Sequence, residues 1–182
     1  TLHAPQPVRF TLNVRRPGWL AGSPSMRVNG SAVDASSAPW LTVEREWRDG
    51  DTVEVALPAG LHTWPLPDEP SSVAFLYGPL VLAGIVDDST AADTLKAEQN
   101  LPPQAEAART PRMYFTSDAP GDTSWLHAEP GERLRFRAQG QPWPVRFKPF
   151  NEVVGERYGL YWPLVPAGSD RQQRFDQENA AL

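Results

Sequence analysis

The stretch that decides the fold runs from Phe10 to Val86: FTLNVRRPGWLAGSPSMRVNGSAVDASSAPWLTVEREWRDGDTVEVALPAGLHTWPLPDEPSSVAFLYGPLVLAGIV. Apolar and polar residues alternate in its short segments FTLNV, MRV, LTVEREW and TVEVAL. This period of two is typical of strands with one buried and one solvated face. The last run, VAFLYGPLVLAGIV, is apolar nearly throughout and predicts a strand or strand pair buried on both faces, broken at Gly78-Pro79. The stretch therefore predicts an antiparallel β-sandwich.

Turn residues predict how these strands are connected. Asn29-Gly30 favours a type I′ turn, because both residues tolerate a positive φ. Asp49-Gly50-Asp51 predicts a hairpin that joins LTVEREW to TVEVAL. The segment LHTWPLPDEPSS contains three prolines, and proline cannot donate to a sheet ladder. We expect a long extended connection there, covering an edge or an end of the sandwich.

The composition changes over residues 87–109, where alanine, acidic residues and amides replace β-branched residues. Ser89 or Thr90 could cap a short helix, which Pro102-Pro103 would prevent from continuing. This segment predicts a linker and the best domain boundary. A solvated connection without a helix is the alternative.

Strand patterns return from residue 110 in RMYFTS, RLRFRA, PVRFKPF and RYGLYW, whereas the tail after Pro166 lacks apolar periodicity and predicts a surface segment. The fold class is therefore all-β, an antiparallel, jelly-roll-like β-sandwich, in two small β domains joined by a partly helical linker. The first domain is predicted at residues 1–86. The second β region, residues 110–182, either forms a separate domain or completes or packs on the first.

Composition excludes several classes of function. The chain has 182 residues, a net charge of −5 and no run of lysine or arginine, so a nucleic-acid partner is not expected. No apolar run approaches the roughly 20 residues of a membrane span. Cysteine is absent, which excludes disulfides, thiol catalysis and cysteine-based metal sites but leaves the compartment open. The chain starts without methionine or a signal peptide, so we expect a segment of something longer.

The sequence contains no strong pattern for metal or cofactor binding. His3, His62 and His127 lie far apart in predicted loops, without the spacing of metal ligands. Phosphate loops, dinucleotide fingerprints and the nucleophile elbow Gly-x-Ser-x-Gly are absent, although a Ser-His-Asp triad is not excluded by residue order alone. Asp49 and Asp51 could bind Ca²⁺, but aspartate is also a common residue in tight turns, and the turn alone explains both residues. We expect no metal and no cofactor.

One carboxylate pair has the spacing of a glycosidase site. Glu44 and Glu46 lie on the same face of a predicted strand, about 7 Å apart by the rise per residue. That face is opposite Val43 and Trp47, which indicates solvent rather than an active site. We expect no catalytic residue in this chain.

Aromatic residues are the better binding candidates. Five tryptophans fall at predicted strand ends or in proline-rich loops. Flat aromatic rings stack on sugars, and exposed tryptophans are otherwise costly. Each tryptophan could instead plug the end of a sandwich or pack against a missing domain, and these alternatives stay open. The candidate carbohydrate-binding or interdomain residues are Trp19, Trp40, His62, Trp64, Trp125 and Trp143.

Several short motifs occur in an order that resembles a known family. They are Arg16-Pro17-Gly18-Trp19, Val28-Asn29-Gly30, Arg45-Glu46-Trp47, Gly50-Asp51, Leu57-Pro58, Tyr77-Gly78-Pro79-Leu80-Val81 and, near the end, Pro149-Phe150 with Arg157-Tyr158-Gly159-Leu160-Tyr161-Trp162. This order resembles the C-terminal β-sandwich region of β-L-arabinofuranosidase-type glycoside hydrolases, family 127 and relatives.

The resemblance implies a non-catalytic accessory module of a carbohydrate-active enzyme. In such enzymes a cysteine nucleophile near zinc lies in an N-terminal (α/α)₆ barrel, and no position of this chain matches that motif. The implied partner is the catalytic barrel of the parent enzyme, with a homodimer in some relatives and a periplasmic or extracellular location favoured. An independent carbohydrate-binding module for a plant-type polysaccharide is the alternative function, and a free-standing hydrolase is the third.

Overall fold

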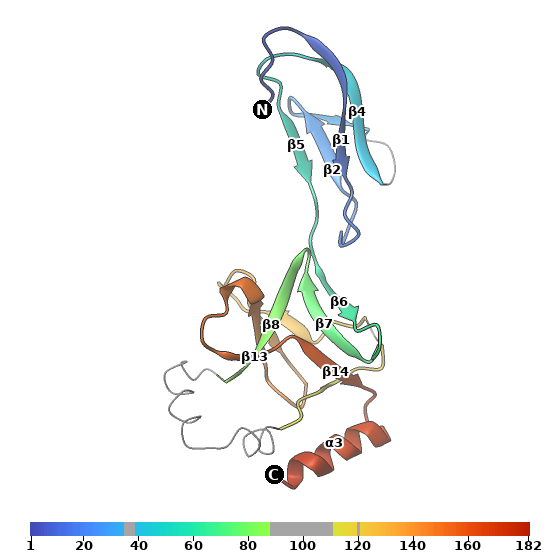
Figure 1. Ribbon diagram of the computed structural model, residues 1–182, viewed down its shortest axis with the longest axis vertical. Helices are drawn as coiled ribbons and strands as arrows, with labels where there is room; N and C mark the ends of the chain where they lie inside the picture. Colours follow the sequence, from blue (N-terminus) through green and yellow to red (C-terminus); the bar gives the residue numbers. More distant parts are fainter. Residues whose placement is uncertain (35–38, 88–110, 120) are drawn as a thin grey trace. The chain divides into compact units, whose positions relative to one another are not determined.

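The computed structural model describes residues 1–34, 39–87, 111–119 and 121–182 (Figure 1). These residues divide into two compact units, Thr1–Gly60 and Leu61–Leu182. Strands in mainly antiparallel sheets dominate both units, which confirms the predicted all-β fold class. The predicted linker helix near residues 89–99 lies outside the described residues. Within the described ranges, no helix is long and apolar enough to span a membrane.

The first unit is built from two small sheets. Strand β1 pairs antiparallel with β4 along all eight residues of each, and β2 lies between β3 and β5 in a second, antiparallel sheet. The strands are β1 (Val8–Arg15), β2 (Ser25–Val28), β3 (Ser31–Val33), β4 (Trp40–Trp47) and β5 (Val53–Ala56).

Alternating burial marks one inner face on each sheet of the first unit. Met26 and Val28 are buried on β2, and Leu41 and Trp47 are buried on β4. The Trp47 ring stacks on Phe10 with ring centroids 5.5 Å apart, and its Nε1 donates a hydrogen bond to the Phe10 carbonyl. This period of two is the alternation that the sequence predicts for a half-buried strand.

One predicted turn of the first unit is confirmed and another is corrected. Asn29 and Gly30 both have positive φ, 51° and 77°, as a type I′ turn requires. The Asp49–Asp51 turn does not close a hairpin, because β4 pairs with β1 whereas β5 pairs with β2. The turn instead carries the chain from the sheet of β4 to the sheet of β5.

The described strands of the second unit form one nine-stranded sheet. Its main order is β10-β11-β12-β8-β7-β14-β9, with β13 paired to β8 and β6 paired to β7, and β9 runs parallel to β14. The strands are β6 (Leu61–Pro65), β7 (Ser72–Tyr77), β8 (Leu80–Asp87), β9 (Phe115–Thr116), β10 (Leu126–Ala128), β11 (Phe136–Ala138), β12 (Arg146–Pro149), β13 (Arg157–Gly159) and β14 (Tyr161–Val165).

The hairpin of β7 and β8 organises this sheet. The two strands pair across the Gly78-Pro79 turn as far as Phe75 and Leu82, and then they separate. Beyond this point each strand has a new partner. Strand β7 pairs with β14 from Ala74 to Ser72, and β8 pairs with β13 from Gly84 to Asp87. The segment β13–β14 therefore fills the opening between the two arms (Figure 1).

Two paired glycines make room for a tryptophan at this junction. Gly84 and Gly159 are partners in register, and a Cβ on either would lie 2.4 Å or 2.7 Å from Cζ2 of Trp162. The Trp162 indole is buried and contacts the rings of Phe115 and Phe147 at 5.2 Å and 5.8 Å. The ring thus lies directly on the backbone of two strands.

The observed division of the chain differs from the predicted boundary at residue 86. Strands β7 and β8 pair with β14 and β12 of the C-terminal half, so they belong to the second unit. Strand β6, expected as an extended connection, is an edge strand along β7 and ends at Pro65. The apolar run of β7 and β8 is the centre of the second core rather than the end of the first.

The tail, predicted as a surface segment, forms helix α3 (Asp170–Ala180). Ser169 caps it by accepting a hydrogen bond from the Gln172 backbone N–H. Phe175 is the buried residue of α3 and stacks on Tyr114 with ring centroids 5.4 Å apart. One buried ring gives no periodic signal, so apolar periodicity could not find this helix; the Ser-x-x-Gln capping pattern could have done so. A short 3₁₀ helix, η1 (Phe150–Glu152), follows β12.

Candidate functional site

The carboxylate pair with glycosidase spacing lies on the outer face of β4. Glu44 and Glu46 are exposed, as predicted. Glu44 forms an ion pair with Arg9 at 3.2 Å, and Glu46 forms one with Arg48 at 3.2 Å. Each carboxylate is therefore solvated and bound to its own guanidinium, which is the arrangement of surface ion pairs rather than of two carboxylates facing a substrate.

Asp51 has a structural role in the first unit. It accepts hydrogen bonds from Asn29 Nδ2 at 2.7 Å and from the Arg48 backbone N–H at 2.9 Å, with the Arg45 guanidinium at 3.7 Å. The Asn29 bond, then the Arg48 N–H, hold the pKa of Asp51 below its ordinary value. The Asn29 Oδ1 accepts from the Thr52 N–H, so the side chains tie two turns together.

This network predicts a pH dependence for the first unit. Because the folded pKa of Asp51 is lowered, its contribution is complete above the unfolded value of about 4 and is lost as the pH falls below it. We expect the amide protection of β4 and β5 to decline on acidification from about pH 5 to pH 2.5. Asp51→Asn should weaken protection at pH 6 and flatten this decline, whereas parallel pH curves for the two proteins would contradict the assignment.

The three histidines lie on separate elements of the structure. His3 lies 3.5 Å from Asp49 at an exposed turn, His62 is on β6 and His127 is on β10. Within the described ranges, no group of three or more histidine or acidic side chains has the geometry to hold an ion.

A charged cluster on the second unit was not expected from the sequence. Arg146 donates three hydrogen bonds to Glu129, from Nη2 to Oε2 at 2.7 Å and from Nε to Oε2 at 3.1 Å and to Oε1 at 3.2 Å. Arg137 Nε donates a further one to Glu129 at 3.1 Å. The Arg146 bonds, and then those of Arg137, lower the pKa of Glu129. Glu156 beside Lys148 has a lowered pKa for the same reason, with a further bond from the Val154 N–H. These carboxylates stay ionised and paired near neutral pH.

A hollow of about 280 Å³ adjoins this cluster, and its lining includes Arg135, Arg146, Lys148, Glu132 and Glu156. Arg135 forms an ion pair with Glu152 at 2.6 Å. The charges of the lining are balanced by ion pairs, so the hollow has the chemistry of a structural network rather than of an acid–base pair. No sequence pattern marks it, because strands and loops from distant positions supply its members.

The structure distributes the predicted tryptophans over different environments. Trp19 is half-buried in a turn and Trp40 is about half-exposed at the start of β4, both in the first unit. In the second unit, Trp125 is buried against Phe75 and Phe115, and Trp143 packs against the same core. The rings of Trp125 and Trp143 therefore stabilise the fold.

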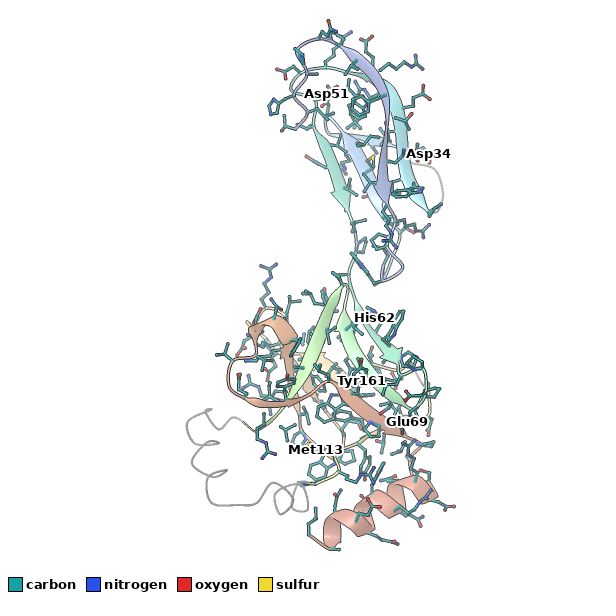
Figure 2. The ribbon with its side chains drawn as sticks, viewed as in Figure 1. Asp34, Asp51, His62, Glu69, Met113 and Tyr161 are labelled. Carbon is teal, nitrogen blue, oxygen red and sulfur yellow. The ribbon has the colours of Figure 1, made fainter. Side chains whose placement is uncertain are left out.

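Trp64 is the most exposed of the candidate tryptophans and lies on a paired strand. It is 64% exposed on β6 and pairs in register with Ala74 of β7, which pairs in turn with Tyr161 of β14. Tyr161 is 51% exposed, so two exposed aromatic side chains flank one small, buried residue in the same row of the sheet. His62, the remaining candidate, lies two residues before Trp64 on the same face of β6 (Figure 2). The candidates from the sequence did not include Tyr161, because it joins Trp64 only through Ala74 of β7, far away from both in the sequence.

The first unit resembles a domain of a known enzyme family. Residues 1–59, nearly the whole first unit, match the family model described as the β-L-arabinofuranosidase, GH127 middle domain. The predicted family resemblance is confirmed. No curated protein matches the chain.

Solved structures of glycoside hydrolases, two of them GH127 enzymes, share the fold of most of the chain. A GH127 β-L-arabinofuranosidase from Geobacillus stearothermophilus T6 aligns with a TM-score of 0.53 at 19% identity, over 90% of this chain. A glycoside hydrolase gives 0.52 at 18% over 86% of this chain, and a GH127 β-arabinofuranosidase gives 0.51 at 16% over 88%. The chain spans 28% of the length of each of these proteins.

The GH127 match and the units agree with each other. The matched residues end at 59, one residue before the boundary between the units at Gly60. The motifs that suggested the resemblance occupy turns and strand ends of both units, including Asn29-Gly30 and Gly78-Pro79.

Proposed function

We propose that this chain is the non-catalytic β-sheet portion of a GH127-type glycoside hydrolase and that it packs against a catalytic domain carried outside this chain. The observation that carries the proposal is the match of residues 1–59 to the GH127 middle domain. The coverage of 28% of GH127 enzymes by nearly the whole chain supports it, since those enzymes contain much more than this fold.

The chemistry of the described side chains supports the non-catalytic part of the proposal. The resemblance implies a cysteine nucleophile, and the chain has no cysteine. Among the residues that the structure describes, the carboxylates with a shifted pKa are Asp51, Asp122, Glu129 and Glu156, and in each the pKa is lowered. A general acid needs the opposite shift at working pH.

Exposed apolar side chains support the packing part of the proposal. Val154 is 85% exposed, and Phe150 and Tyr158 form an exposed aromatic contact with ring centroids 5.3 Å apart. Trp40 and Val8 are exposed on the first unit. Both units thus expose large apolar side chains to solvent. This pattern is expected where further domains cover the surface.

The first test is an activity assay of the pure chain. We expect no hydrolysis of aryl β-L-arabinofuranosides above the rate of buffer between pH 4 and pH 8. The control is the complete encoded protein, or a GH127 enzyme, under the same conditions. Turnover by the pure chain that follows its concentration would overturn the non-catalytic assignment.

A further inference from the structure

The exposed row Trp64–Ala74–Tyr161 lies on the outer face of the second sheet. Residues that are partners in register point to the same face, and neighbouring partners are about 5 Å apart at Cα. The Cα atoms of Trp64 and Tyr161 are therefore separated by about 10 Å, with Ala74 between them. The adjacent residues Val73, Phe75 and Trp162 point to the other face and are buried in the core.

The two rings form an apolar surface that the unit does not cover itself. Ala74 is only 5% exposed although it is the smallest member of the row, so its neighbours cover it. Trp64 and Tyr161 remain more than half-exposed. Exposed rings of this size cost free energy in water, and aromatic rings on a rigid sheet lose little further entropy when a ligand covers them.

The surroundings of the row indicate the charge of its ligand. The same face carries His62, Leu76 and Val81 in one neighbouring row and Ser72 with Pro163 in the other. None of these positions is aspartate, glutamate, lysine or arginine, although the chain as a whole has a net charge of −5. Charged side chains flank these rows on two sides, with Arg146 and Lys148 on β12, and with Arg171 of α3 next to Ser71. The Arg171 charge is balanced by Glu69 at 2.6 Å.

From this geometry we propose that the face of β6, β7 and β14 binds a neutral oligosaccharide of two or more units by stacking on Trp64 and Tyr161. An uncharged face with two flat rings complements the apolar faces of sugar rings, and the Tyr161 hydroxyl can bond a sugar hydroxyl. The span of about 10 Å exceeds a single sugar ring, so each aromatic ring contacts a different unit. The proposal rests on the accessory role proposed above only for the choice of the polysaccharides used as probes.

The test uses the chain as it is, in affinity electrophoresis through gels that contain neutral arabinan or arabinoxylan, with a gel of anionic polygalacturonate in parallel. We expect retardation by at least one neutral polysaccharide and none by the anionic one. Trp64→Ala and Tyr161→Ala should each weaken binding about tenfold, whereas Trp64→Phe and Tyr161→Phe should retain part of it. Phe150→Ala, which removes an exposed ring outside the row, is the matched control and should bind like the unaltered chain.

Several results would overturn the proposal. They are free migration in every neutral gel, retardation that persists in both alanine variants, or retardation by the anionic polymer alone. Light scattering can give one more contradicting result. A concentration-dependent dimer that Trp64→Ala abolishes would assign the face to a second copy of the chain. Unchanged thermal midpoints in the variants exclude unfolding as the cause of lost binding. Failure here leaves the accessory role intact, because that role is tested by activity and by complex formation with a catalytic domain.

Discussion

Gly84→Ala is expected to destabilise the second unit by about 3 kcal/mol and to lower its thermal midpoint by roughly 10 °C. The added methyl carbon would lie 2.4 Å from Trp162 Cζ2, 2.9 Å from Val145 Cγ1 and 3.0 Å from Phe147 Cε1. The Trp162 ring is enclosed by other aromatic rings and cannot move aside without disturbing them. The paired Gly159→Ala should act in the same direction, with its closest contact at 2.7 Å.

The effect of Gly84→Ala is measured by thermal unfolding against a matched control. Gly121→Ala adds the same methyl group where nothing lies within 4 Å, and we expect its midpoint within a few degrees of the unaltered chain. Trp162→Phe, a smaller ring, should offset part of the loss when it is combined with Gly84→Ala, so the two changes are not additive. A midpoint for Gly84→Ala equal to that of Gly121→Ala would contradict the packing described for Trp162.

Trp47→Ala is expected to unfold the first unit while the second stays folded. The Trp47 side chain is fully buried, stacks on Phe10, donates to its carbonyl and has the Arg45 guanidinium 5.2 Å from its ring centroid. Truncating a buried tryptophan costs about 3–5 kcal/mol. A unit of this size has a stability of about 3–5 kcal/mol from its core, so the loss is of the same size as the whole.

Hydrogen exchange resolves the two units in this experiment. We expect amides of β1, β2, β4 and β5 to lose protection in Trp47→Ala and those of β7 and β8 to keep it. Trp40→Ala is the matched control, because it removes a tryptophan from the exposed start of the same strand and should cost less than about 1 kcal/mol. Loss of protection throughout the chain would show that the two units unfold as one.

The sequence allows the strands to be predicted better than their partners. Alternation in FTLNV and LTVEREW marks β1 and β4, and Asn29-Gly30 and Gly78-Pro79 mark turns that the structure contains. The partner of a strand depends on side chains far away in the sequence. The pairing of β5 with β2 rather than with β4 was missed for that reason, and so was the boundary at Gly60.

The candidate site could be predicted only in part for the same reason. Trp64 follows from an exposed, proline-rich segment, but Tyr161 joins it only because β7 lies between their strands. Trp125 has a loop-like sequence and is nevertheless buried, because rings from other strands close over it. Local composition does not determine whether an aromatic residue faces the core or the solvent.

The most direct test of the account is whether this chain forms a complex with a catalytic domain. The chain and the separately produced catalytic domain of the same encoded protein are mixed and followed by size-exclusion chromatography with light scattering. The account predicts a complex of one copy of each and a higher thermal midpoint for the catalytic domain in the mixture. Separate elution of the two proteins, with the midpoint of the catalytic domain unchanged, would contradict it.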